Sequence, residues 1–289
     1  MQHLILFTFT TLLLLTSCDK KIYTNETPQE IVVEGWIDAG GYPIVMLSKS
    51  IPISSEWQSF ENLDEYVIKW GKVTVSDGEK EVVLTGKYDS DYYPPYIYTT
   101  TEIQGVAGKK YKLMVSYNEF YAEAETTIPE IVELEAIYGT YSDNKYILKA
   151  KIDDNPNEHN YYKFFARVID RDNMYLSSNI AVINDADYNF PAEIPIEIGS
   201  SMLYDKHLRD FVLTKEHSVR IKFAAIDSVA YTFWNDYKNV VEISRNSMFR
   251  YNNNIHSNIK GGLGYWFGYG ATEYLCLSNK HNEPIKISR

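Results

Sequence analysis

The chain has 289 residues, of which 45% are hydrophobic and 23% are charged. This balance is ordinary for a globular protein and excludes collagen-like, low-complexity and mainly disordered chains. The formal net charge of −11 repels a phosphate backbone, so we expect no nucleic-acid partner. The length is enough for about two domains. Aromatic residues make up 15% of the chain and favour strands, because flat rings pack well on a pleated surface.

The first residues have the pattern of a bacterial lipoprotein signal peptide. The apolar run from Leu4 to Leu15 is shorter than the roughly 20 residues that a membrane-spanning helix needs. It leads into Leu15-Thr16-Ser17-Cys18, which resembles the lipobox, where a branched residue and two small ones precede the cysteine that receives the lipid. The segment before the run, residues 1–3, departs from the pattern because it has no lysine or arginine. We predict a signal peptide at residues 1–17, with cleavage before Cys18 and acylation of Cys18 with palmitate or a similar chain. The alternative is a buried N-terminal strand followed by a free cysteine.

The residues after the predicted cleavage point have the composition of a tether. Residues 18–28 are polar and include a proline, so we expect them to hold a folded body off the bilayer. If Cys18 is acylated, Cys276 is the remaining cysteine and no intramolecular disulfide can form. Cys276 lies in an apolar, strand-like run, which predicts a buried structural thiol rather than a nucleophile.

Short strand-like runs separated by turn residues follow the tether. Runs at 31–37 and 44–47 flank a Gly-Gly-Tyr-Pro turn, and runs at 73–76 and 81–84 flank an Asp-Gly turn. Mostly apolar residues alternate with mostly polar ones, with period two, over 111–117 and 122–128, until Pro129 ends the pattern. The pattern predicts an antiparallel sandwich over residues 29–129. The stretch from Gly108 through Tyr111 resembles the strand entry of immunoglobulin-like and fibronectin-like domains, where a tyrosine packs or hydrogen-bonds at the sheet corner.

A second set of runs predicts a C-terminal β-rich domain over residues 130–289. These runs cover 133–141, 146–152, 161–170, 180–183, 194–198 and 219–226. One segment instead has helical spacing. Its large apolar residues lie three or four positions apart, at Tyr231, Trp234, Tyr237 and Val241, and Asp227 or Ser228 before them can cap a helix. We therefore predict a helix over 228–243. The predicted fold is mainly β, with two β-sandwich-like domains, the N-terminal one immunoglobulin- or fibronectin-like, and one main helix in the C-terminal domain.

Six segments carry a family pattern in their order and spacing: Val32–Ile37, Val73–Asp77, Gly108–Val115 with Thr126–Pro129, Asn160–Phe164, Tyr231–Trp234 and Asn258–Tyr265. Together they resemble the Bacteroidota lipoprotein family catalogued as domain of unknown function 4249, over essentially the whole mature chain. The resemblance implies an outer-membrane lipoprotein of two β-rich parts, encoded beside TonB-dependent receptors. It implies no catalytic or ligand residue. The residues after Cys18 depart from the acidic cluster that resembles a surface-export signal in this group, so the surface and periplasmic faces both stay open.

The sequence lacks the motifs of the common catalytic and cofactor sites. It has no phosphate-binding loop, zinc helix or nucleophile elbow, so we expect no enzyme, no cofactor and no metal. Asp153, Asn155 and Asn157 imitate the first ligands of a calcium loop, but Glu158 replaces the turn glycine and Phe164 the closing glutamate. A solvated loop is the favoured interpretation. Acidic pairs such as Asp170 and Asp172 could serve a glycosidase, although sequence gives no distance between them.

Three segments are candidates for contact or modification. The first is Tyr92–Tyr98, where prolines stiffen a run of tyrosines; the alternative is an edge strand whose tyrosines pack in the core. The second is Gly261–Gly270, where glycines among aromatic residues indicate close backbone approach. The third, Asp227-Ser228-Val229, resembles a short O-glycosylation motif and overlaps the helix cap.

These observations lead to a functional expectation. We expect an outer-membrane-anchored, non-enzymatic lipoprotein that is an accessory to a TonB-dependent transporter. A surface glycan-binding or adhesive lipoprotein is the alternative. The identity of a small-molecule or glycan ligand stays open.

Overall fold

Strands far outnumber helices in the described residues, which confirms the mainly β prediction. The structure, a computed structural model, describes residues 29–50, 64–155, 158–178, 182–198, 211–244 and 255–287. The predicted signal peptide, Cys18, the tether and Asn157 lie outside these residues. Within them, no helix is long and apolar enough to cross a bilayer.

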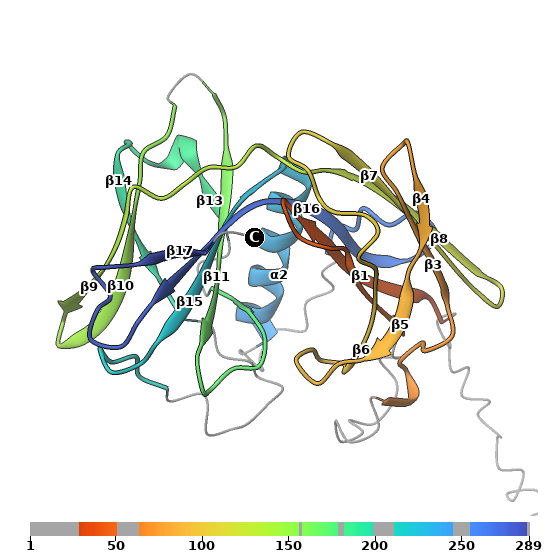
Figure 1. The fold of residues 1–289 in the computed structure, drawn as a ribbon, viewed down its shortest axis with the longest axis horizontal. Helices are drawn as coiled ribbons and strands as arrows, with labels where there is room; N and C mark the ends of the chain where they lie inside the picture. Colours follow the sequence, from red (N-terminus) through yellow and green to blue (C-terminus); the bar gives the residue numbers. More distant parts are fainter. Residues whose placement is uncertain are drawn as a thin grey trace, which may run out of the picture.

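A long twisted sheet runs through the centre of the molecule (Figure 1). In the described residues it has ten strands, eight of them in one continuous order. That order is β12 (Leu176–Ser177), β11 (Tyr161–Val168), β15 (Val219–Ile226), β16 (Leu263–Cys276), β1 (Ile31–Asp38), β2 (Ile44–Lys49), β6 (Tyr96–Thr99) and β5 (Thr85–Tyr88), with β13 (Ile183–Asn184) beside β11 and β17 (Ile285–Ile287) beside β16. β1 and β16 pair in parallel, and the other pairs in this sheet are antiparallel.

Two smaller sheets cover opposite ends of one face of the central sheet (Figure 1). One consists of β4 (Glu81–Val83), β3 (Lys72–Ser76), β7 (Lys110–Tyr117) and β8 (Phe120–Thr127), and the other of β14 (Ala192–Ile196), β10 (Lys145–Ile152) and β9 (Ala136–Ser142). Each has its own apolar core, to which β16 contributes Trp266 at one end and Tyr274 and Cys276 at the other. The arrangement is therefore two sandwiches that share one sheet.

The segment 128–135 joins β8 to β9, and this crossing from one smaller sheet to the other lies directly on β16. A Cβ added at Gly268 would come within 2.9 Å of the Ile128 backbone, so only a glycine leaves room for this crossing. Pro129, the predicted domain boundary, follows Ile128 in the crossing. Because β16 belongs to the sheet of β1, the two halves share backbone hydrogen bonds. The division into domains at residues 29–129 and 130–289 stays a prediction.

The helix α2 (Ser228–Ser244) covers the other face of the central sheet, close to its predicted position. Asp227 is the N-cap, since its carboxylate accepts the amide hydrogen of Ala230 at 2.8 Å. Phe233 and Trp234 pack on the rings of Tyr265 and Phe267 of β16. The predicted stripe is correct for Trp234 and wrong for Tyr237, whose side chain is 43% exposed. The buried stripe passes through Phe233 instead.

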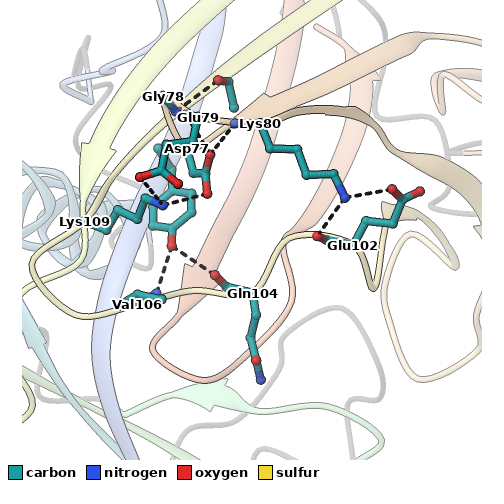
Figure 2. A network of polar contacts seen from close by, with 10 residues as sticks. Asp77, Gly78, Glu79, Lys80, Glu102, Gln104, Val106 and Lys109 are labelled. Carbon is teal, nitrogen blue, oxygen red and sulfur yellow. Dashed lines mark hydrogen bonds and ion pairs between the residues drawn. The ribbon is translucent and has the colours of Figure 1, made fainter.

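The first sandwich contains the hydrogen-bonded tyrosine that its sequence resemblance implies. The Tyr111 hydroxyl donates to the Gln104 carbonyl at 3.0 Å and accepts from the Val106 amide at 2.9 Å. Figure 2 shows these backbone groups beside the Asp-Gly turn, where Lys109 reaches the Asp77 carboxylate at 2.8 Å. The Lys109 hydrogen bond is the main reason that the pKa of Asp77 is lowered to about 2. The turn is thus tied to the corner by a charged hydrogen bond.

Candidate functional site

The tyrosine-rich segment 92–98 packs into the sheet more than it faces solvent. β6 lies between β2 and β5, so it is not the edge strand of the alternative prediction. Tyr98 is 2% exposed, and its hydroxyl donates to the Ile68 carbonyl at 2.8 Å and accepts from the Gly71 amide at 2.9 Å. Tyr96 is half-buried, and its hydroxyl donates to the Lys69 carbonyl at 2.9 Å. These two tyrosines therefore hold the sheet and its neighbouring loop, and they do not form the predicted contact surface.

These hydrogen bonds fix the loop that carries Trp70. Its neighbours on both sides, Lys69 and Gly71, are bound by Tyr96 and Tyr98. The same loop also pairs with the end of β2, since the Ile68 amide donates to the Leu47 carbonyl at 2.9 Å. Trp70 itself is 87% exposed. A large aromatic side chain that is exposed on a fixed backbone loses little conformational entropy when a partner covers it.

Tyr88 extends this aromatic surface onto the edge of the central sheet. It lies opposite Tyr96 on the adjoining strand, which puts both side chains on the same face. Tyr88 is 72% exposed on β5, the outermost strand. Gly86 makes the arrangement possible, because a Cβ there would come within 2.5 Å of the Tyr96 hydroxyl. We call the group Lys69, Trp70, Lys72 and Tyr88 the Trp70 surface.

The Trp70 surface combines aromatic rings with cationic side chains. Lys69 and Lys72 are exposed, and neither forms an ion pair in the part of the chain that the structure describes. Two exposed carboxylates, Asp64 and Glu65, lie on the turn that precedes the loop. Rings with polar tips next to flexible ammonium groups are suited to recognition by contact, because they offer an apolar face and charge together. They do not form an acid–base pair.

Sequence reasoning missed the Trp70 surface, although a signal was present. Lys69-Trp70-Gly71-Lys72 places one large aromatic residue among two lysines and a glycine. Glycine and charged residues favour a turn at the surface. This setting could have indicated that Trp70 is exposed.

A second cluster, which the sequence also did not predict, lies beneath α2. Lys222 forms a buried ion pair with Asp38 at 2.6 Å, and the Tyr175 hydroxyl donates to Glu273 at 2.7 Å. Lys163 lies 4.4 Å above the ring of Trp234, and burial lowers its pKa to about 7. Lys163 is only 1% exposed. The helix therefore seals this charged layer from solvent, and we interpret it as part of the packing of α2.

The other predicted cysteine and glycine features have structural roles. Cys276 is fully buried at the end of β16, and burial raises its pKa to about 12, in agreement with an inert thiol. The predicted contact segment Gly261–Gly270 forms the start of β16, which is buried in the sheet from Tyr265 onward. Close backbone approach is confirmed there, whereas a contact surface is not supported.

Residues of the candidate calcium loop and of the candidate acidic pair form hydrogen bonds with near neighbours in the chain. Asn155 donates its side-chain amide to Glu158 at 3.0 Å, and Asp153 is exposed. Asp172 accepts hydrogen bonds from the Val168 amide and from the Arg171 guanidinium. Its carboxylate therefore stabilises the turn that follows β11. Among the described residues, no group of three or more histidine, cysteine or acidic side chains is placed to hold a metal.

The third candidate segment lies at the start of α2. Asp227 caps the helix, and the Ser228 side chain is exposed. Glycosylation of this exposed serine stays a prediction.

The comparisons with known proteins agree with the family pattern in the sequence. The profile of the family described as Domain of unknown function (DUF4249) matches residues 19–274. No curated protein matches the chain significantly. The match covers both sandwiches, the Trp70 surface and α2. The chain therefore belongs to the DUF4249 family.

Proposed function

We propose that this chain is a lipid-anchored, non-enzymatic protein of the bacterial outer membrane that acts as an accessory to a TonB-dependent transporter. Acylation of Cys18 with palmitate or a similar chain would attach it, and residues 18–28 would tether the body. Its Trp70 surface would contact other components of that membrane.

The observation that carries the proposal is the fixed, exposed position of Trp70. Tryptophan and tyrosine contribute strongly to interfaces when they are well positioned, and hydrogen bonds from Tyr96 and Tyr98 position this loop before any partner arrives. An anchored body is also confined near other membrane proteins. This confinement raises the effective concentration, so that a modest interface is enough for association.

A surface glycan-binding or adhesive lipoprotein is the second candidate. The exposed rings of Trp70 and Tyr88 favour it, because exposed aromatic faces on a rigid loop can also stack on sugar rings. This alternative predicts binding of a polysaccharide that requires Trp70, with or without a transporter.

The test is purification of the tagged chain after mild detergent extraction of outer membranes. We expect a β-barrel transporter to co-purify with the wild-type chain and to be absent from Cys18→Ala, which lacks the acylated cysteine. A second outer-membrane lipoprotein with the same tag is the control for non-specific capture. A pull-down that contains only this chain, together with Trp70-dependent binding on a glycan array, would replace the transporter proposal with the glycan alternative.

A further inference from the structure

We propose that the Trp70 surface docks on the lipid headgroup region of the membrane that carries the anchor, and so sets the orientation of the folded body on the bilayer. This inference rests on the lipid anchor of the proposed function and names the partner of the same surface. It assigns lipid as the direct contact of Trp70, and the docked body would then meet the transporter of the proposed function in a fixed orientation.

The first argument is the chemistry of the exposed side chains. Trp70 and Tyr88 are 87% and 72% exposed. Tryptophan and tyrosine favour the boundary between hydrocarbon and water, where the ring meets acyl chains and the polar tip meets headgroups. Lys69 and Lys72 flank Trp70 in the sequence and are exposed, and a lysine stem can lie along an apolar surface while its ammonium group reaches a phosphate. The four side chains therefore match the chemistry of this boundary.

The second argument is charge. The chain as a whole carries −11 and is repelled by an anionic bilayer. Lys69 and Lys72 are free to meet phosphates, whereas the nearby Lys87 forms an ion pair with Asp89 at 3.0 Å. Asp64 and Glu65 on the preceding turn offset this local positive charge. The aromatic rings therefore supply most of the attraction, and the two lysines add contacts with lipid phosphates.

The third argument is the position of the Trp70 surface relative to the anchor. The Glu30 amide, at the start of the body, donates to the Ser50 hydroxyl at 2.9 Å, and the Lys49 amide donates to the Tyr66 carbonyl at 2.9 Å. Trp70 follows Tyr66 by four residues, at most roughly 14 Å along the chain. Residues 18–28 reach at most about 40 Å, at roughly 3.6 Å per residue. A bilayer that holds Cys18 is therefore within reach of the Trp70 surface.

The fourth argument is rigidity. Tyr98 is buried in the core of the first sandwich, and its hydroxyl holds both Ile68 and Gly71. The Trp70 loop is thus held rigidly to the central sheet. Docking of this one loop would orient the whole body, which a flexible tether alone cannot do.

The experiment measures contact between Trp70 and lipid in the full acylated chain. The chain is reconstituted on phosphatidylcholine–phosphatidylglycerol vesicles whose acyl chains carry bromine, which quenches nearby tryptophans. Because the chain has five tryptophans, Trp70→Phe identifies the contribution of Trp70 by difference. We expect stronger quenching of the wild type than of Trp70→Phe. The orientation control is Tyr141→Trp in the Trp70→Phe chain, since Tyr141 is 65% exposed on β9, in the other smaller sheet, and should stay unquenched.

Flotation of the same vesicles separates failure of the docking from failure of the anchor. A chain that floats and is quenched as strongly as Trp70→Phe overturns the docking and leaves the anchor in place. If Trp70→Ser then abolishes binding on a glycan array, the surface recognises glycan instead. A wild-type chain that does not float overturns both the anchor and the docking.

Discussion

Replacing Tyr98 with phenylalanine tests whether the tyrosine hydroxyl holds the loop of Trp70. The substitution keeps the ring in the core and removes only the oxygen, which donates to the Ile68 carbonyl and accepts from the Gly71 amide. The Ile68 carbonyl lies in buried surroundings, where an unsatisfied polar group costs about 1–3 kcal/mol. We therefore expect the free energy of unfolding to fall by about 1–3 kcal/mol.

Urea unfolding of Tyr98→Phe and of the wild type measures this fall in the free energy of unfolding. Tyr96→Phe is the matched control, because its hydroxyl makes one exposed hydrogen bond, to the Lys69 carbonyl, and its loss should cost about 0.5–1 kcal/mol. The slope of free energy against urea should be the same in both variants and the wild type, since the surface exposed on unfolding does not change. Equal stability of Tyr98→Phe and the wild type would refute the argument that this hydroxyl clamps the loop.

Three further predictions concern the packing and charge of the folded body. Gly268→Ala should lower stability by about 1–3 kcal/mol in thermal or urea unfolding, because the new methyl group meets the Ile128 backbone at 2.9 Å; an unchanged midpoint would contradict the close crossing. The pKa of Asp77, lowered to about 2 by Lys109, lies below its unfolded value near 3.9, so its stabilisation is present above pH 4 and is lost as the pH falls toward 2. Unfolding of Asp77→Asn should therefore depend less on pH in that window, and an identical pH profile would count against the Lys109 contact. The thiol of Cys276 should resist alkylation in the folded chain and react after unfolding, with Cys276→Ala as the control; rapid reaction under native conditions would disprove its burial.

Local features of the fold were predictable because nearby residues specify them. The period-two pattern over 111–117 places Tyr111, Leu113 and Val115 in the core, as observed. The Asp-Gly turn at 77–80 is also present, with the Asp77 carboxylate accepting two backbone amides of the turn. Each of these depends on side chains within a few positions of one another, which a single sequence contains.

The features that escaped prediction depend on contacts far apart in the chain. The parallel pairing of β1 with β16 joins residues more than 200 positions apart, and no local pattern specifies such a partner. Lys163 and Lys222 lie on the same face of β11 and β15, opposite the core that these strands share with β10. Period two would favour solvent there, but α2 covers that face and buries both lysines. The tyrosines of β6 face the loop before β3 and bind its backbone, which alternation alone cannot show.

The fate of Cys18 tests the central claim of a lipid-anchored body most directly. Cells that express the full chain are grown with labelled palmitate, and the purified protein is assayed for label. The proposed function predicts label in the wild type and none in Cys18→Ala, whereas Cys276→Ala should be labelled as strongly as the wild type because its thiol is buried. Absence of label from the wild type, or label that persists in Cys18→Ala, would contradict the anchor and the membrane location that follows from it.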